Sequence, residues 1–186
     1  VCQTIKETVD YLNTKENTRY KTGLIEVHLY RPFSAAHLLQ AIPGSVRQIT
    51  VLDRTKEPGA AGEPLYLDVL AALRDTAFHN IPILSGRYGL SSKDTTPDQI
   101  YAIFRNMDDT KKDRKAFFTV GITDDVTNMS LPVNAHIQTA PSDTICCKFW
   151  GLGGDVTISA NKNSIKIIGN NTDKYVQAYY DYDSKK

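Results

Sequence analysis

The sequence has few cysteines and no clustered histidines. Its 186 residues include three cysteines, Cys2, Cys146 and Cys147. This number and spacing exclude a disulfide framework and C-x-x-C metal ligation. The adjacent Cys146 and Cys147 are predicted to be buried thiols in a reducing compartment. The four histidines, which are predicted to have packing or surface roles, lack the spacing of a metal site or a triad: His28, His37, His79 and His136.

An excess of charge is also missing, with 22 Lys and Arg against 21 Asp and Glu. This balance excludes the basic surface that nucleic acid or an anionic membrane would require. No apolar run approaches the roughly 18 to 20 residues that span a bilayer, so a soluble protein is expected. The chain has no initiator Met and no signal-peptide core, and it stops abruptly after a strand-like run. We expect an internal piece of a longer protein.

The first half of the sequence alternates strand and helix patterns. Ile5, Val9 and Leu12 follow helical spacing. Strands are predicted at residues 23–30, 48–53 and 82–86. Helices are predicted at residues 35–41, 64–76 and 97–107, with Ser34 as a cap and proline near two of the starts. The alternation predicts an α/β domain with right-handed crossovers over a mostly parallel sheet.

In the second half, the alternation of strand and helix patterns ends at a charged run at residues 108–114. Residues 116–122 and 133–138 have strand patterns without intervening helices, so we expect a connecting ribbon near residues 108–143. A strand at 144–150, a tight loop at 151–155, a helix at 159–168 and a strand at 175–182 then predict the beginning of a second βαβ unit.

The loop Gly151-Leu152-Gly153-Gly154-Asp155 is the main candidate site. Glycines allow close approach of a ligand to the backbone, and a following helix N-terminus favours an anion such as phosphate. The pattern is neither the dinucleotide fingerprint nor a Walker A loop. A phosphate cradle and a plain strand-to-helix turn are equally compatible with it. Asp155 is predicted to cap the helix rather than meet a ligand. Lys162, Lys185 and Lys186 are either phosphate contacts or solvated cations.

Other polar groups give no catalytic arrangement. The loop that follows Asp53 mixes Arg54, Lys56 and Glu57, which predicts an internal ion-pair network rather than catalysis. Asp124-Asp125 has no partner motif. The residues themselves therefore indicate one candidate anion site, no catalytic residues and no metal ligands.

Nine motifs follow one another along the chain in a consistent order. They are Leu29-Tyr30-Arg31-Pro32-Phe33, Val51-Leu52-Asp53-Arg54-Thr55-Lys56-Glu57-Pro58-Gly59, Gly62-Glu63-Pro64-Leu65-Tyr66, Gly86-Arg87-Tyr88-Gly89-Leu90-Ser91-Ser92-Lys93-Asp94, Phe118-Thr119-Val120-Gly121-Ile122, Asp124-Asp125-Val126-Thr127, Lys148-Phe149-Trp150-Gly151-Leu152-Gly153, Ala160-Asn161-Lys162 and Tyr182-Asp183-Ser184-Lys185-Lys186. Together these motifs resemble pyruvate:ferredoxin (flavodoxin) oxidoreductases, and the resemblance covers nearly the whole chain.

The resemblance implies a domain organisation. Residues 1–108 would belong to a domain similar to the C-terminal domain of transketolase, truncated at its N-terminus. Residues 109–143 would be a connecting ribbon, and residues 144–186 would begin a coenzyme A-binding α/β domain, truncated at its C-terminus.

The resemblance also implies an activity for the parent enzyme: oxidative decarboxylation of pyruvate with coenzyme A to acetyl-CoA and CO2, reducing ferredoxin or flavodoxin. Thiamine diphosphate and [4Fe-4S] clusters would be held outside this segment, which would be inactive alone. The parent would be a homodimer in the cytoplasm, or in a hydrogenosome-like organelle of an anaerobic protist. It would contact its other domains and the electron carrier, but neither nucleic acid nor membrane.

Coenzyme A contacts are implied for Gly153, Gly154, Asp155, Val156 and Thr157, and for Lys185. The family pattern has glycine in place of Val156 and of Ser159. A positive φ at Val156 would strain a β-branched residue.

Two other functions fit the same residues. One is a fusion that uses NADP in place of ferredoxin. The other is a stand-alone coenzyme- or nucleotide-binding module.

Overall fold

The computed structural model describes residues 1–180 except residues 17, 91–92, 109, 111 and 124–125. The expected strand end beyond residue 180, the cations Lys185 and Lys186, and the pair Asp124-Asp125 lie outside the described residues. The chain forms two compact units, Val1–Thr139 and Ala140–Lys186.

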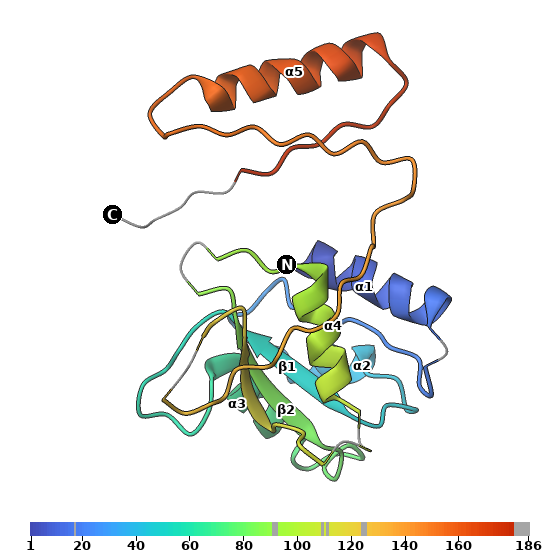
Figure 1. Cartoon of the computed structure of the whole chain (residues 1–186). Coiled ribbons are helices and arrows are strands. Elements are labelled where there is room, and N and C mark those ends of the chain that lie inside the picture. The colour runs from blue at the N-terminus through green and yellow to red at the C-terminus, as the bar shows by residue number, and fades with distance from the viewer. Residues whose placement is uncertain (17, 91–92, 109, 111, 124–125, 181–186) are drawn as a thin grey trace. The chain divides into compact units, whose positions relative to one another are not determined.

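The first unit is built on a parallel sheet. Strands β1 (Ile49–Asp53), β2 (Ile83–Tyr88) and β3 (Phe117–Val120) lie side by side in the order β1-β2-β3 (Figure 1). Ile49 pairs with Ile83, and Ser85 pairs with Phe117. The α/β class predicted from the alternating pattern is confirmed. Strand β3 lies within the segment expected to be a connecting ribbon.

Four helices accompany the sheet at the predicted positions: α1 (Cys2–Lys15), α2 (Ala35–Ala41), α3 (Pro64–Leu73) and α4 (Pro97–Asn106). Their starts follow from local chemistry. The Ser34 hydroxyl accepts the His37 N–H at 3.3 Å. The side chains of Thr96 and Gln99 each accept the other's backbone N–H, forming a capping box. These interactions satisfy donors that a helix N-terminus leaves without partners.

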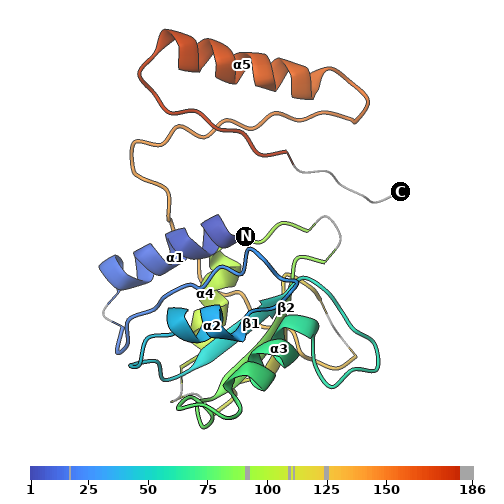
Figure 2. The same ribbon diagram turned by 180° about the vertical axis from the view of Figure 1, so that it is seen from behind.

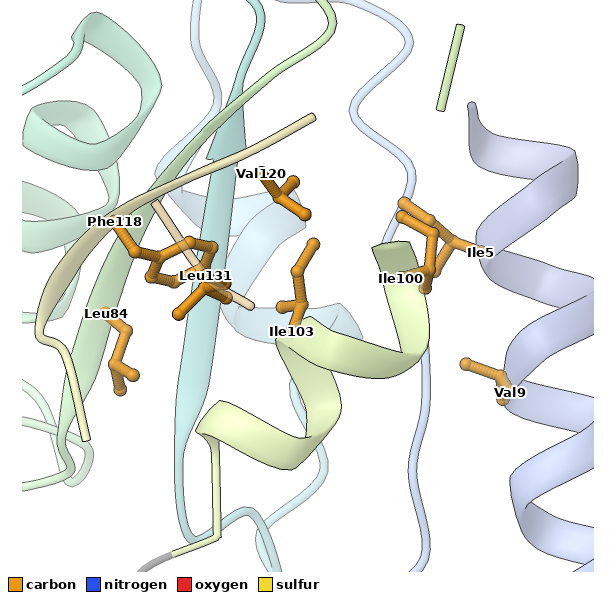
Figure 3. Packing of buried hydrophobic residues seen from close by; sticks show 8 residues of the cluster. All are labelled: Ile5, Val9, Leu84, Ile100, Ile103, Phe118, Val120 and Leu131. Atoms are coloured by element: carbon orange, nitrogen blue, oxygen red, sulfur yellow. The ribbon is translucent and has the colours of Figure 1, made fainter. Parts of the chain in front are cut away.

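Each face of the sheet carries its own apolar cluster. One face packs against α1 and α4 through the eight residues drawn in Figure 3: Ile5, Val9, Leu84, Ile100, Ile103, Phe118, Val120 and Leu131. The other face packs against α2 and α3 through Ile42, Val51, Tyr66, Val69 and Leu73. Figures 1 and 2, which view the sheet from its two sides, show α4 and α3 on opposite faces. Both faces are therefore covered.

This two-sided arrangement corrects the expectation of uniformly right-handed crossovers. The strands follow one another across the sheet in chain order, yet the connecting helices α3 and α4 lie on opposite faces. Two crossovers that advance in the same direction over opposite faces have opposite hands, so one of them is left-handed. The consequence is one helix layer on each side of three strands, which buries apolar residues from both faces.

Two predicted strands of the first unit are not strands in the structure. Residues 23–30 and 133–138 are irregular. Their alternating pattern is typical of strands, but neither segment pairs with the described strands β1 to β3. Residues 133–138 are held instead by side-chain contacts, since Asp98 accepts the Ile137 N–H at 2.8 Å.

In the described part of the second unit, residues 140–180, the helix α5 (Thr157–Asn171) confirms the helix predicted there. Residues 144–150 and 174–180 flank it without strand assignment, so the predicted strands of a second βαβ unit are wrong for the described residues. Cys146 and Cys147 are exposed, and the prediction of buried thiols is wrong. Burial of this apolar run requires a packed second layer, and α5 itself has no buried residue.

Candidate functional site

The glycine loop before α5 has the backbone geometry of a tight turn. Gly153 and Gly154 have φ values of 82° and 70°, which only glycine adopts without cost. A Cβ at either position would meet no atom within 4 Å. The two glycines are therefore required by conformation, and the space above them is open to a ligand.

The Asp155 side chain makes hydrogen bonds with the backbone of this loop. Its carboxylate accepts the Leu152 N–H at 3.0 Å and the Thr157 N–H at 3.1 Å. Hydrogen bonds from Thr157 and Leu152 to the carboxylate lower the pKa of Asp155. The residue immediately before α5 is Val156, which makes no side-chain cap. The predicted capping role holds to the extent that Asp155 satisfies the first N–H of the helix.

Val156 has an ordinary backbone conformation, with φ −86° and ψ 8°. The strain that a positive φ would impose on a β-branched residue therefore does not arise. Its side chain is 78% exposed, so it does not fill the loop.

The loop and the first turn of α5 suit a phosphate in part. The N–H groups of Ile158 and Ser159 lie in the first helical turn, where no acceptor exists within a helix. Lys162 follows on the same helix, with its Nζ 5.7 Å from the centre of the Tyr180 ring. The structure thus groups Gly153 to Thr157 in one turn, with Lys162 on the same helix. The carboxylate of Asp155 is the one group there that opposes an anion.

In the loop after β1, backbone N–H groups bind two carboxylates. The Asp53 carboxylate accepts the N–H groups of Leu65 at 3.0 Å and Tyr66 at 3.2 Å. Burial raises the pKa of Asp53, against the effect of these two hydrogen bonds. Glu63 accepts the Glu57 N–H at 2.8 Å with one oxygen and lies 3.4 Å from the Arg87 guanidinium with the other. The ion pair given for this region joins Glu63 to Arg87, and a network of Asp53, Arg54, Lys56 and Glu57 stays a prediction.

Sequence reasoning missed Glu63, Arg87 and Asp98 as structural residues. Glu63 was readable in part, because it stands directly before Pro64 at the start of a helix, where carboxylates are favoured. Arg87 and Asp98 act across long separations in the chain, which no local pattern reveals.

The histidines take surface roles. His28 lies 3.2 Å from Glu26, and His136 lies 3.0 Å from Asp98. Nowhere in the described residues do three or more His, Cys, Asp or Glu side chains gather in a way that could hold a metal ion. No described helix has the length and apolar character needed to cross a bilayer.

Comparisons with known proteins agree along the whole chain. A family model described as pyruvate:ferredoxin oxidoreductase core domain II matches residues 1–100. The pyruvate:ferredoxin oxidoreductase of Moorella thermoacetica is 55% identical over 185 residues, which cover 100% of this chain and 15% of that protein. The probable pyruvate-flavodoxin oxidoreductase of Escherichia coli is 54% identical over 98% of this chain and 16% of its own length.

A third relative carries a different description. The pyruvate dehydrogenase (NADP+) of Cryptosporidium parvum is 47% identical over 98% of this chain and 9% of its own length. The chain thus spans between 9% and 16% of the three relatives.

Proposed function

The chain belongs to the pyruvate:ferredoxin oxidoreductase family, and on that premise we propose that it is part of an enzyme that decarboxylates pyruvate oxidatively. In this reaction coenzyme A accepts the acetyl group, CO2 is released, and the electrons pass to ferredoxin or flavodoxin. The observation that carries the proposal is identity of 54–55% along nearly the whole chain to enzymes with those names.

Within that enzyme we assign different roles to the parts of the chain. Residues 1–108 form a scaffold similar to the C-terminal domain of transketolase. Residues 109–143 connect it to a coenzyme A-binding domain that begins at residue 144. Thiamine diphosphate, the [4Fe-4S] clusters and the pyruvate site belong to other parts of the enzyme, which functions as a cytoplasmic or organellar homodimer.

The coenzyme A contribution is assigned to Gly153, Gly154, Asp155, Val156 and Thr157, together with Lys185. The support is chemical: two glycines with positive φ leave open space beside helical N–H groups, where a phosphate of the coenzyme would lie. When bound, coenzyme A supplies the thiol that accepts the acetyl group. The chain's own part is to bind and orient the phosphate end.

The electron acceptor is assigned to residues beyond this segment. The Cryptosporidium relative, whose description includes NADP+, shares these residues at 47% identity. An activity assay of the full-length enzyme compares the reduction of ferredoxin, flavodoxin and NADP+. It separates an enzyme that reduces ferredoxin or flavodoxin from a fusion that uses NADP. Reduction of NADP+ alone would support the fusion alternative.

The site is tested by replacing its glycines in the full-length enzyme. Gly154→Ala places a side chain at φ 70° without a clash, which strains the loop by about 1–2 kcal/mol. We expect the KM for coenzyme A to rise about fivefold or more, with the KM for pyruvate unchanged. Gly44→Ala, which meets no atom and has no positive φ, is the matched control.

A second variant sharpens this test. Val156→Gly keeps the backbone N–H, which is the only group that we assign to the coenzyme site at this position, and the φ of −86° suits any residue, so the KM for coenzyme A should stay unchanged. An unchanged KM in Gly154→Ala would remove the loop from the coenzyme site.

The isolated chain tests whether thiamine diphosphate, the [4Fe-4S] clusters and pyruvate are bound by other domains. The isolated 186-residue chain, supplied with pyruvate, thiamine diphosphate, coenzyme A and ferredoxin, is expected to reduce no ferredoxin. Turnover would show that the segment itself holds a complete active site.

A further inference from the structure

Trp150 is the only tryptophan of the chain, and its side chain is exposed. It stands directly before the glycine loop, and 81% of its surface is accessible. Tryptophan is highly buried on average in folded proteins, because its ring has a large apolar surface. It is also enriched at interfaces, where the ring contacts another molecule. The exposed indole beside the loop therefore indicates a binding contact.

The glycine loop returns on itself, which places Trp150 close to the start of α5. A Cβ on Gly151 would lie 2.7 Å from the Thr157 hydroxyl oxygen and 3.0 Å from a carboxylate oxygen of Asp155. The absence of a side chain at Gly151 thus lets this backbone approach the first residue of α5. Trp150, the preceding residue, is held near the N–H groups of the first helical turn.

A lysine ammonium group lies over the indole of Trp150. The Lys148 Nζ is 4.7 Å from the centre of the ring, which is within the range of a cation–π contact. Trp150 is still 81% exposed with this lysine in place, so most of the ring is free to stack on a planar ligand. The positive charge next to the ring favours a ligand that combines an aromatic ring with negative charge.

Coenzyme A, the ligand proposed for the loop, has both of these groups. Its one aromatic ring system is the adenine, and its phosphates are attached to the adjoining ribose. A phosphate at the loop would therefore bring the adenine within reach of Trp150. We propose, on the basis of the coenzyme A site proposed above, that Trp150 stacks on the adenine ring and that Lys148 holds the indole in place. Trp150 then distinguishes coenzyme A from acyl acceptors without a base.

Calorimetric titration of the full-length enzyme without pyruvate tests this contact, because it measures binding in place of turnover. Two ligands are compared: coenzyme A, and 4′-phosphopantetheine, which has the same thiol arm and a phosphate but no adenine. Loss of an aromatic ring that stacks on a base weakens binding by about tenfold. We expect Trp150→Leu to raise the Kd for coenzyme A by this factor and to leave the Kd for 4′-phosphopantetheine unchanged. Trp150→Phe keeps a smaller ring and should give an intermediate Kd for coenzyme A.

Tyr175→Leu is the matched control, because Tyr175 is an aromatic residue of the same unit and is 104% exposed. It should leave the Kd for each ligand unchanged. An unchanged Kd for coenzyme A in Trp150→Leu would overturn the stacking contact. An equal rise in Kd for both ligands would also overturn it, since Trp150 would then support the fold of the unit and not bind the base.

Gly154→Ala distinguishes this contact from the coenzyme A site on which it depends. If the loop is the site, Gly154→Ala should raise the Kd for both ligands, whereas Trp150→Leu should raise only the Kd for coenzyme A. A rise for both ligands in Gly154→Ala with no change in Trp150→Leu would overturn the stacking contact and keep the loop site. No change in either variant would overturn both assignments.

Discussion

Gly86 in the middle of β2 allows the Phe118 ring to pack close to the backbone of this strand. A Cβ at this position would lie 2.5 Å from ring atoms of Phe118 and 2.8 Å from a methyl group of Leu52. Phe118 is 1% exposed, so its ring has little room to move away. The missing side chain of Gly86 therefore gives the Phe118 ring its place over the sheet.

Gly86→Ala is expected to lower the free energy of unfolding by about 1–3 kcal/mol, the usual cost of overpacking a filled core. Urea denaturation of the chain measures this change. Gly44→Ala, where an added Cβ meets nothing within 4 Å, serves as the control and should be neutral or slightly stabilising. Equal urea midpoints of unfolding for the two variants would show that the core rearranges to accommodate the added methyl group.

Single residues also show the limit of reasoning from sequence. The apolar run around Cys146 and Cys147 predicts burial, but burial is a property of neighbours that the run does not contain. The sequence around Asp53 predicts one ion among several that are close along the chain. Its partners, the N–H groups of Leu65 and Tyr66, begin 12 residues later and depend on how α3 packs.

At the scale of elements, the first turn of α4 binds residues 136–137, which are distant in sequence. Asp98, in the first turn of α4, accepts the Ile137 N–H at 2.8 Å and contacts His136 at 3.0 Å. Ile137 itself is buried, at 7% exposed. Burial alone would raise the pKa of Asp98, but the Ile137 N–H and the His136 ring outweigh it, and the pKa is lowered.

Asp98→Ala is expected to destabilise the chain by about 1 kcal/mol at neutral pH, through the lost hydrogen bonds. A carboxyl whose pKa is lower in the folded state stabilises above its unfolded pKa of about 3.9. The difference between wild type and variant should therefore be constant above about pH 4 and shrink as the pH falls through the folded pKa.

Thermal unfolding between pH 2.5 and 7 measures this difference. Asp75→Ala is the matched control, because Asp75 and its partner Arg74 are 78% and 79% exposed, and such pairs contribute little. A gap between wild type and Asp98→Ala that stays the same down to the lowest pH would contradict the role of the ionised carboxylate.

Helices were predictable from sequence and several strands were not, for a physical reason. A helix satisfies its own backbone, so signals such as Ser34, Thr96 and Pro97 suffice to place it. A strand, in contrast, forms its backbone hydrogen bonds with a neighbouring strand, which its own sequence does not specify. Residues 23–30 and 144–150 have strand composition but no described pairing partner, and remain irregular. The composition of the glycine loop predicts its position. It does not predict that Asp155 accepts the Leu152 N–H inside the loop.

At the scale of the whole molecule, the two units differ in how much they bury. The sheet of the first unit contributes buried residues from all three strands. In the second unit α5 has no buried residue, and Trp150 and Leu152 are 81% and 102% exposed. Stability follows buried apolar area, so the two units should open with very different free energies.

Hydrogen exchange of the full chain measures this contrast directly. We expect amides of β2, such as those of Leu84 and Ser85, to exchange at least about 100-fold more slowly than amides in the middle of α5. Amides of α4 serve as an internal comparison, because Ile100 and Ile103 are 1% and 3% exposed. Equal protection in α5 would mean that the second unit is stabilised by contacts beyond its own residues.

The strand order of the first unit bears on how the chain is made. Because β1, β2 and β3 are neighbours in the order in which they are synthesised, each strand leaving the ribosome can add to the free edge of the strands before it. Among these three described strands, no later one has to be inserted between two earlier ones. Domains tend to fold as units during synthesis, from the N-terminal side, and this sheet can grow stepwise along one edge, with α3 and then α4 closing over alternate faces as they emerge.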